Sequence, residues 1–211
     1  MLNYLQQHFA KAENDTYIGK NITVRHLLSG VGLPQTAYRL GANLRRDQTD
    51  FALQVGIAGS YNRAWQLGTV VNVTTECFAD VGITERDGSF TDVFELGLTD
   101  RNEYPYQNGL LVNAPATEFS FLPVAHGLSV NKVNGTAADI AQIGTKYPTA
   151  DIETMEGASF AYACLMQHIP FVQLRGISNY VEPRNRAAWN IPLAIDKVNE
   201  AAIALLQSLS V

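Results

Sequence analysis

The sequence predicts a single α/β domain in which a mixed, mostly parallel central sheet is flanked by helices. The first observation is size, because 211 residues with 46% apolar side chains can bury one substantial core. The second is the order of the periodic segments, since a strand, a helix and a second strand follow one another near the start. The sequence contains neither repeats nor linker-like segments, so we expect one domain over residues 1–211.

The first half of the chain supplies three expected strands and one helix between the first two. The strands are runs of β-branched and apolar residues at 23–28, 51–58 and 67–75. A helix is expected over 35–46, because the preceding Pro34 suits the first turn of a helix. This order favours parallel pairing, with helices on the faces of the sheet.

The second half continues the alternation after a long irregular middle. Residues 80–123 are dense in Gly, Asp, Asn and Pro, which indicates long loops with hairpin strands. Beyond them the sequence predicts helices at about 134–147 and 152–168, an apolar strand at 171–177 and a last amphipathic helix from near Pro192. The second of these helices should end before Pro170, which cannot continue it.

Composition and charge argue against several classes of protein. The formal charge is −5 and no run of Lys or Arg forms a phosphate-binding patch, so nucleic acid is not an expected partner. No segment approaches the roughly 20 apolar residues of a membrane helix, and the N-terminus has no signal-peptide pattern. We therefore expect a cytoplasmic protein without a membrane partner. Cys77 and Cys164 lack partners at ligand spacing, so buried thiols are expected, with no disulfide, metal or cofactor.

Polar residues gather at two places where a ligand site would form. Glu156 is followed by small residues, which allow close approach of a ligand, and Met155 offers an apolar surface beside the carboxylate. The run from Arg175 to Asn179 ends the expected strand 171–177, and open α/β sheets place their sites at such carboxyl ends. Taken alone, Glu156 would more often be a solvated helix residue. The surroundings favour a pocket.

Three motifs resemble the site motifs of the nucleoside phosphorylase and nucleosidase superfamily. They are Gly-Ile-Ala-Gly-Ser at 56–60, Thr-Met-Glu-Gly-Ala at 154–158 and Arg-Gly-Ile-Ser-Asn at 175–179. Within the superfamily, the segments 79–82, 94–98 and especially 176–189 resemble the futalosine hydrolases of menaquinone biosynthesis. The resemblance covers nearly the whole chain and implies a nucleoside phosphorylase-like fold with cleavage of an N-glycosidic bond.

The resemblance also implies roles for individual residues. Glu156 would stabilise the cation-like ribose, with Met155 under the sugar, and Asn179 would donate to N7 of the departing purine. Further substrate contacts are implied for a set that surrounds the base and sugar, namely Ile57, Ala58, Gly59 and Val133. Ser178 and Arg175 would orient Asn179.

Asn179 bears on which purine is cleaved. Adenine-specific nucleosidases of the superfamily carry aspartate at this position, whereas the asparagine NH2 can donate both to N7 and to an oxygen at C6. A 6-oxopurine such as hypoxanthine is therefore the expected base of the substrate, futalosine. The alternative is that Asn179 only forms a turn after the strand.

The segment 183–189 is expected to border the ribose 5′ substituent. Futalosine carries a carboxylated benzoyl group there, so Trp189 would pack against the ring and Arg184 or Arg186 would pair with the carboxylate. A solvated basic loop, with Trp189 anchoring the last helix, is an equally open interpretation.

One element of the superfamily pattern has no match. Hydrolysing members use a glutamate just after their first strand to activate water, whereas residues 1–9 resemble the helix that follows it. We therefore expect the first strand of the sheet, with that glutamate, to lie upstream of Met1 and the 211-residue chain to hydrolyse futalosine weakly or not at all.

The sequence leaves three further functions open. A purine nucleoside phosphorylase would need a cationic phosphate site, yet the glycine-rich run 30–32 is followed by no early Arg or Lys. The same motifs would also fit a nucleosidase for 5′-substituted adenosine or a catalytically impaired nucleoside-binding protein. The superfamily resemblance implies in addition a homo-oligomer, a dimer or larger.

Overall fold

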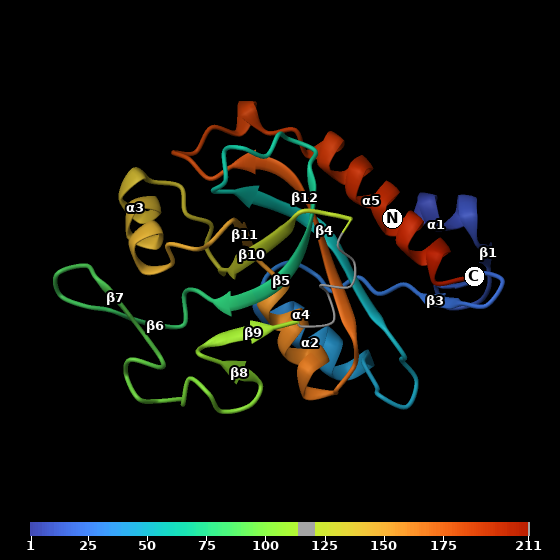
Figure 1. Ribbon diagram of the computed structural model, residues 1–211, viewed down its shortest axis with the longest axis horizontal. Helices are drawn as coiled ribbons and strands as arrows, with labels where there is room; N and C mark the ends of the chain where they lie inside the picture. The colour runs from blue at the N-terminus through green and yellow to red at the C-terminus, as the bar shows by residue number, and fades with distance from the viewer. Residues whose placement is uncertain (114–120, 211) are drawn as a thin grey trace.

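The computed structural model describes residues 1–113 and 121–210 and has the expected single-domain α/β fold, with a mixed central sheet and flanking helices (Figure 1). The sheet has seven strands in the order β10-β11-β4-β12-β5-β9-β8. Their bounds are Val124–Ser129 (β10), Ile152–Thr154 (β11), Ala52–Ser60 (β4), Phe171–Tyr180 (β12), Val70–Phe78 (β5), Leu110–Val112 (β9) and Tyr106–Gln107 (β8).

Five of these strands close into a ring, because β5 pairs with β10 in addition to its neighbours β12 and β9. The pairings β10–β11, β4–β12 and β5–β10 are parallel, whereas β4–β11 and β5–β12 are antiparallel. β4 and β12 run side by side along almost their whole length. Their ends therefore hold Gly59 and Asn179 next to each other.

Helices pack against the ring on two different sides (Figure 1). α2 (Leu33–Asn43) packs against α4 (Gly157–Met166) on one side, and α5 (Ile191–Ser208) lies along β12 and β4 on the other. α1 (Leu2–His8) contacts α5, and α3 (Ala137–Lys146) begins at Thr136, whose side chain accepts from the Asp139 N–H. The last helix is capped in the same way by Asn190.

The expected helix over 152–168 is wrong in its first part. Ile152, Glu153 and Thr154 form β11, and the helix α4 begins only at Gly157. All three residues of β11 are buried between β10 and β4. Three residues are too few to show a period of two, and polar Glu153 and Thr154 are buried, so hydrophobic periodicity cannot separate this strand from the helix that follows.

The strand expected at 23–28 is shorter and does not join the central sheet. β3 (Thr23–Arg25) pairs antiparallel with β2 (Thr16–Ile18), which pairs with β1 (Ala10–Lys11). Only Val24 of β3 packs against an apolar cluster, which also contains Leu5 and Tyr17. β3 therefore pairs with its neighbour in the sequence, β2, and does not enter the parallel sheet that the strand-helix-strand order predicted.

The described part of the irregular middle consists of loops and hairpins, as expected. β6 (Gly82–Thr84) and β7 (Phe90–Asp92) form a projecting hairpin, and β8 and β9 form a second one. Asp92 at the end of β7 links the first hairpin to α3, because its Oδ2 lies 3.4 Å from Lys146 Nζ. The same oxygen lies 3.3 Å from Arg101 Nη2. The remainder of the expected loop, residues 114–120, lies outside the described residues.

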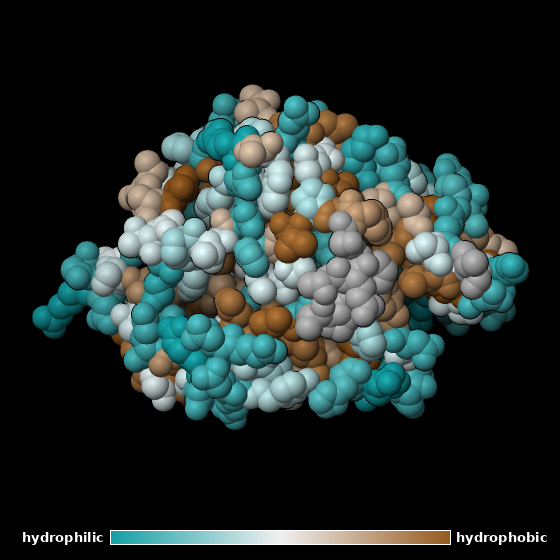
Figure 2. All heavy atoms as spheres, viewed as in Figure 1, coloured by the Kyte–Doolittle hydropathy of each residue, from teal (hydrophilic) through white to brown (hydrophobic). Residues whose placement is uncertain are grey.

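The surface is polar over most of the face shown in Figure 2, and apolar side chains emerge mainly near its middle. Among the residues that the structure describes, no helix is long and apolar enough to cross a membrane. Both cysteines are buried, as expected.

Candidate active site

The ends of β4 and β12, together with β11, bring residues that lie far apart in the sequence to one hollow. Five of the residues singled out from the sequence line it: Gly59, Val133, Asn179, Arg184 and Trp189. The hollow encloses about 60 Å³. Ligand sites usually measure roughly 300–1,000 Å³, so this one can enclose only part of a nucleoside.

Glu156 is the N-cap of α4 and is not among the residues that line this hollow. Its Oε1 accepts a hydrogen bond from the Gly32 N–H at 3.1 Å, and its Oε2 lies 3.6 Å from Arg175 Nη1. The side chain is 19% exposed, so the carboxylate is held from the protein side and open on the other. Met155, which precedes it, is half-buried. The Gly32 N–H and Arg175 thus fix the position of the Glu156 carboxylate.

Arg175 supports Glu156 and not Asn179, contrary to the expectation from the resemblance. Its Nη2 donates to Gln54 Oε1 at 2.8 Å, and its Nη1 faces Glu156. The guanidinium lies directly over Gly56, where an added Cβ would come within 2.2 Å of Nη1. The glycine of the 56–60 motif therefore makes room for the arginine of the 175–179 motif.

A second buried carboxylate, Glu76 on β5, was not singled out from the sequence. Its two oxygens accept hydrogen bonds from Gln173 Nε2 at 2.7 Å and from Ser129 Oγ at 2.9 Å. A Cβ on Gly157 would lie 1.8 Å from Glu76 Oε1, so the first residue of α4 must be glycine for this carboxylate to fit. One indication of this residue was present in the sequence, because Glu76 directly follows the predicted strand 67–75, where site residues of α/β sheets lie.

Burial raises the pKa of Glu76 to about 7, with Glu156 adding in the same direction. The hydrogen bonds from Gln173 and Ser129 and the charge of Arg175 oppose this rise. Glu76, Glu156 and Arg175 thus form a mixed charge cluster under the N-terminus of α4. The protonation of Glu76 changes near neutral pH.

The amide of Asn179 is oriented by its neighbours. Ser178 Oγ lies 2.8 Å from Asn179 Oδ1 and 3.2 Å from the Ala58 carbonyl oxygen, and a hydroxyl has only one hydrogen to donate. The shorter contact places Oδ1 toward Ser178. Asn179 Nδ2 donates to the Tyr180 carbonyl at 3.0 Å. In the described part of the chain, one amide hydrogen is left for a ligand, where two were expected.

The side of the hollow formed by 183–189 combines an aromatic ring with two cations. The guanidinium carbons of Arg184 and Arg186 lie 5.7 Å and 6.0 Å from the ring centre of Trp189. Arg184 lines the hollow, whereas Arg186 starts the short 3-10 helix beside it. The Arg184 N–H donates to the Gly135 carbonyl at 3.1 Å, which ties this segment to the loop that carries Val133.

Glu153 also lines the hollow and was missed by the sequence argument. It accepts hydrogen bonds from the Asn134 N–H at 3.1 Å, Asn134 Nδ2 at 2.5 Å and the Tyr61 hydroxyl at 2.8 Å. Burial, together with the charge and hydrogen bond of Glu153, raises the pKa of Tyr61 above its usual value. Tyr61 therefore stays protonated and donates to the carboxylate.

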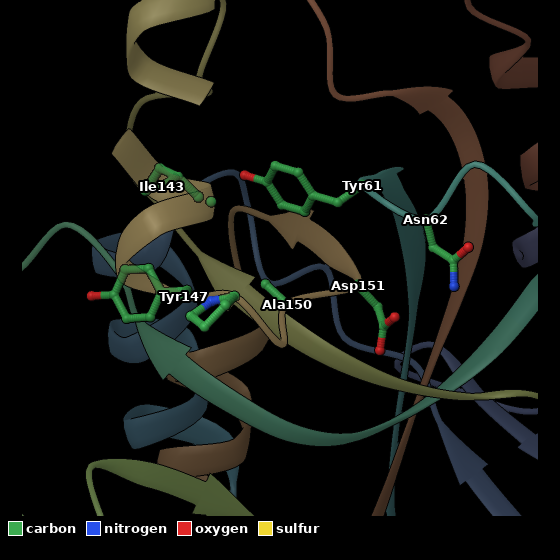
Figure 3. Close-up of a pocket in the computed structure, with 8 residues that line it drawn as sticks. Tyr61, Asn62, Ile143, Tyr147, Ala150 and Asp151 are labelled. Atoms are coloured by element: carbon green, nitrogen blue, oxygen red, sulfur yellow. The ribbon is translucent and has the colours of Figure 1, made fainter. Parts of the chain in front are cut away.

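A second, larger hollow of about 330 Å³ is lined by Tyr61 and by residues of α3 and the segment after it (Figure 3). Figure 3 shows Tyr61 extending from the end of β4 toward α3, with Ile143 and Tyr147 across from it. Asp151 lines the same hollow, and its carboxylate accepts from the His126 N–H. None of the site residues predicted from the sequence borders this space, so size alone does not locate the candidate site.

No group of three or more His, Cys, Asp or Glu side chains in residues 1–113 and 121–210 is arranged to hold a metal ion. The expectation of a site without metal or cofactor stays a prediction. Its chemistry would then come from Glu156, Asn179 and the groups that hold them.

Comparison with known proteins defines the class. The family model of the phosphorylase superfamily matches residues 3–210, and the chain belongs to this superfamily. A futalosine hydrolase of Thermus thermophilus is 32% identical over 86% of this chain and 80% of its own, and that of Streptomyces coelicolor is 34% identical over 72% and 63%. The resemblance to futalosine hydrolases is therefore confirmed.

Relatives with another substrate are more distant in sequence. A 5′-methylthioadenosine/S-adenosylhomocysteine nucleosidase of Colwellia psychrerythraea is 24% identical over 84% of this chain and 75% of its own. The structure of such a nucleosidase from S. pneumoniae superimposes with a TM-score of 0.77 at 19% identity, covering 99% of this chain and 94% of that one. These relatives are enzymes that act on N-glycosidic bonds, and this chain is an enzyme of the same superfamily.

Proposed function

We propose that the protein hydrolyses the N-glycosidic bond of futalosine and releases hypoxanthine and dehypoxanthine futalosine. The observation that carries this proposal is the juxtaposition of the Asn179 amide, held by Ser178, with Arg184 and Trp189 in one hollow. The relatives that are 32% and 34% identical support the same substrate.

Different groups of the site act on the ribose and on the purine base. As the bond from ribose C1′ to purine N9 breaks, its electron pair leaves with the base and the ribose gains positive charge. Glu156 stabilises that charge, and Asn179 donates to N7 of the leaving base. Ile57 and Ala58, which lead to Gly59 on β4, and Met155 border the base and sugar. The oxygen of water then bonds to C1′, and its proton passes to the base.

The attack by water is the step for which the described residues offer no assigned base. The expectation of weak hydrolysis by the 211-residue chain therefore stays a prediction. It is checked by measuring hypoxanthine release from futalosine by this chain and by a form extended at its N-terminus. Full activity of the 211-residue chain would contradict the expectation.

Phosphorolysis is the closest rival reaction. The Gly32 N–H, in the glycine-rich run that could receive phosphate, already donates to Glu156, which speaks for hydrolysis. We expect the rate of base release to be the same with and without phosphate, measured by chromatography of the products. A rate that rises with phosphate, with ribose 1-phosphate as product, would establish the rival.

Two further rivals are separated by substrate and by binding. Cleavage of 5′-methylthioadenosine in preference to futalosine would indicate an adenosine nucleosidase. Calorimetric binding of futalosine without turnover by the extended form would indicate a nucleoside-binding protein. A homo-oligomer, dimer or larger, stays part of the proposal and is checked by light scattering.

The basic segment gives a prediction about substrate affinity. Replacing Arg184 or Arg186 with alanine is expected to raise KM for futalosine by about 10-fold or more, because a charge-assisted hydrogen bond to the benzoate is lost. KM for inosine, which lacks the benzoate, should change little. The control is Lys197→Ala on the exposed side of α5, where Lys197 forms an ion pair with Glu200. Equal effects on both substrates would refute carboxylate recognition by this segment.

A further inference from the structure

The single free hydrogen of Asn179 does not by itself select a purine. N7 accepts a hydrogen bond in hypoxanthine and in adenine alike, so one donor at N7 serves both bases. The two bases differ at C6 and at N1, which carries a hydrogen in a 6-oxopurine and a lone pair in a 6-aminopurine. A protein group that distinguishes the two bases at N1 in favour of the 6-oxopurine must therefore accept a hydrogen bond.

Glu153 lies opposite Asn179 across a glycine. Gly59 on β4 is in register with Glu153 on β11 and with Asn179 on β12. Residues in register on adjacent strands point to the same face, and neighbouring strands lie about 4.8 Å apart. The two side chains therefore rise from the same face at Cα positions roughly 10 Å apart. Both line the same hollow.

Gly59 keeps the space between them open. A Cβ at this position would lie 3.1 Å from Asn179 Nδ2 and 3.0 Å from Val181 Cγ2. With hydrogen in place of a side chain, the strand forms a flat floor on which a planar base can lie. The amide on one side and the carboxylate on the other then meet different edges of the same ring.

The Glu153 carboxylate is fixed but not saturated. Its Oε2 accepts from Asn134 Nδ2 and the Tyr61 hydroxyl, whereas its Oε1 accepts only from the Asn134 N–H among the described residues. A carboxylate oxygen has two lone pairs, so Oε1 can take one more donor. The residue is 6% exposed, so a ligand bonded to it is shielded from competing water.

We propose that Glu153 accepts a hydrogen bond from the N1–H of the bound purine and thereby selects a 6-oxopurine over a 6-aminopurine. This proposal rests on the proposed function for its substrate class. An adenine in the same place would bring its N1 lone pair against the carboxylate and leave both acceptors unpaired. Sites built around such a hydrogen bond reject the analogue that lacks the donor by large factors.

The first test uses the unaltered protein and free bases. Calorimetry is expected to give at least about 100-fold tighter binding of hypoxanthine than of adenine or 1-methylhypoxanthine, since neither of these offers a hydrogen at N1. Equal affinity for hypoxanthine and 1-methylhypoxanthine would overturn the proposal, and so would a failure to bind any of the three bases. This measurement does not depend on turnover.

The second test replaces the carboxylate. Glu153→Gln retains the shape of the side chain and can present its NH2 to the base, so the preference for hypoxanthine over adenine should fall by about 10-fold or more. Circular dichroism checks that the variant is folded, and Glu200→Gln on the exposed face of α5 is the matched control. An unchanged preference in a folded Glu153→Gln variant would overturn the proposal.

Nucleoside cleavage separates this proposal from the proposed function. Futalosine, its N1-methyl derivative and its 6-amino analogue are compared by kcat/KM with the extended form of the protein. If none is cleaved while hypoxanthine binds selectively, the hydrolase function fails and base recognition by Glu153 stands. If futalosine and its N1-methyl derivative are cleaved equally well, the hydrolase function stands and base recognition by Glu153 fails.

Discussion

Replacing Glu156 with glutamine is expected to lower kcat for futalosine hydrolysis by roughly 100- to 1,000-fold, with a much smaller change in KM. The carboxylate is 19% exposed, and in the proposed reaction it opposes the charge that develops on the ribose. Glutamine retains an oxygen that can accept from the Gly32 N–H, so the loss concerns charge more than shape. Steady-state kinetics of hypoxanthine release measures both constants, with parent and variant both in the form extended at its N-terminus.

The control for this variant is Glu200→Gln, which removes one negative charge far from the hollow and should leave kcat unchanged. The unfolding midpoint of Glu156→Gln should fall, because the buried Arg175 loses its ion pair and keeps only its bond to Gln54, and circular dichroism checks that the variant is folded at the assay temperature. A folded Glu156→Gln variant with parental kcat would show that this carboxylate takes no part in the chemistry.

The stability of the protein is expected to fall as the pH rises from about 4.5 to about 7, and Glu76→Gln should remove most of this dependence. The pKa of Glu76 is raised to about 7 in the folded protein from an ordinary value of 4.5, so the folded state binds the proton more tightly. The stabilisation by this proton is fully present at pH values below the pKa of Glu76 in the unfolded state. It is lost as the pH rises through the pKa of Glu76 in the folded state. It amounts to about 3 kcal/mol.

Chemical denaturation at pH 5, 6, 7 and 8 measures this difference. Glutamine can still accept from Gln173 and can donate to Ser129, whose hydroxyl is free to turn toward Thr154. The variant is therefore expected to be more stable than the parent at pH 8, with Glu200→Gln as the control for removal of a surface charge. Parallel pH profiles for the parent and Glu76→Gln would contradict the buried ionisation.

The elements that the sequence predicted best are those with a one-sided pattern or a clear stop signal. β4, β5, β12 and the last helix lie close to their expected bounds, because glycine and proline mark their ends. β11 has only three residues, two of them polar, so the sequence shows no alternation by which it could be recognised. The pairing of Thr23–Arg25 could not be read from periodicity, since pattern gives the face of a strand but not its partner.

The site followed the same division. Glu156 and Asn179 could be chosen because their motifs match a known superfamily, whereas Glu153 stood inside the expected helix 152–168 and Glu76 directly followed the expected strand 67–75. Their importance depends on neighbours far away in the sequence, such as Gly157 under Glu76 and Tyr61 beside Glu153. Side-chain contacts of this range are set by the sheet order, which the local sequence does not contain.

The ring formed by β10, β11, β4, β12 and β5 has a consequence for how such a site diversifies. A strand in a closed ring cannot slide without breaking hydrogen bonds on both of its sides, so the separation between the residues that flank Gly59 is constant. A change of substrate would then require a different side chain at one of these fixed positions and no movement of the strands. Under the proposed base recognition, exchanging one amide or carboxylate on these strands would redirect the enzyme to another base, while the segment 183–189 would vary independently with the rest of the nucleoside.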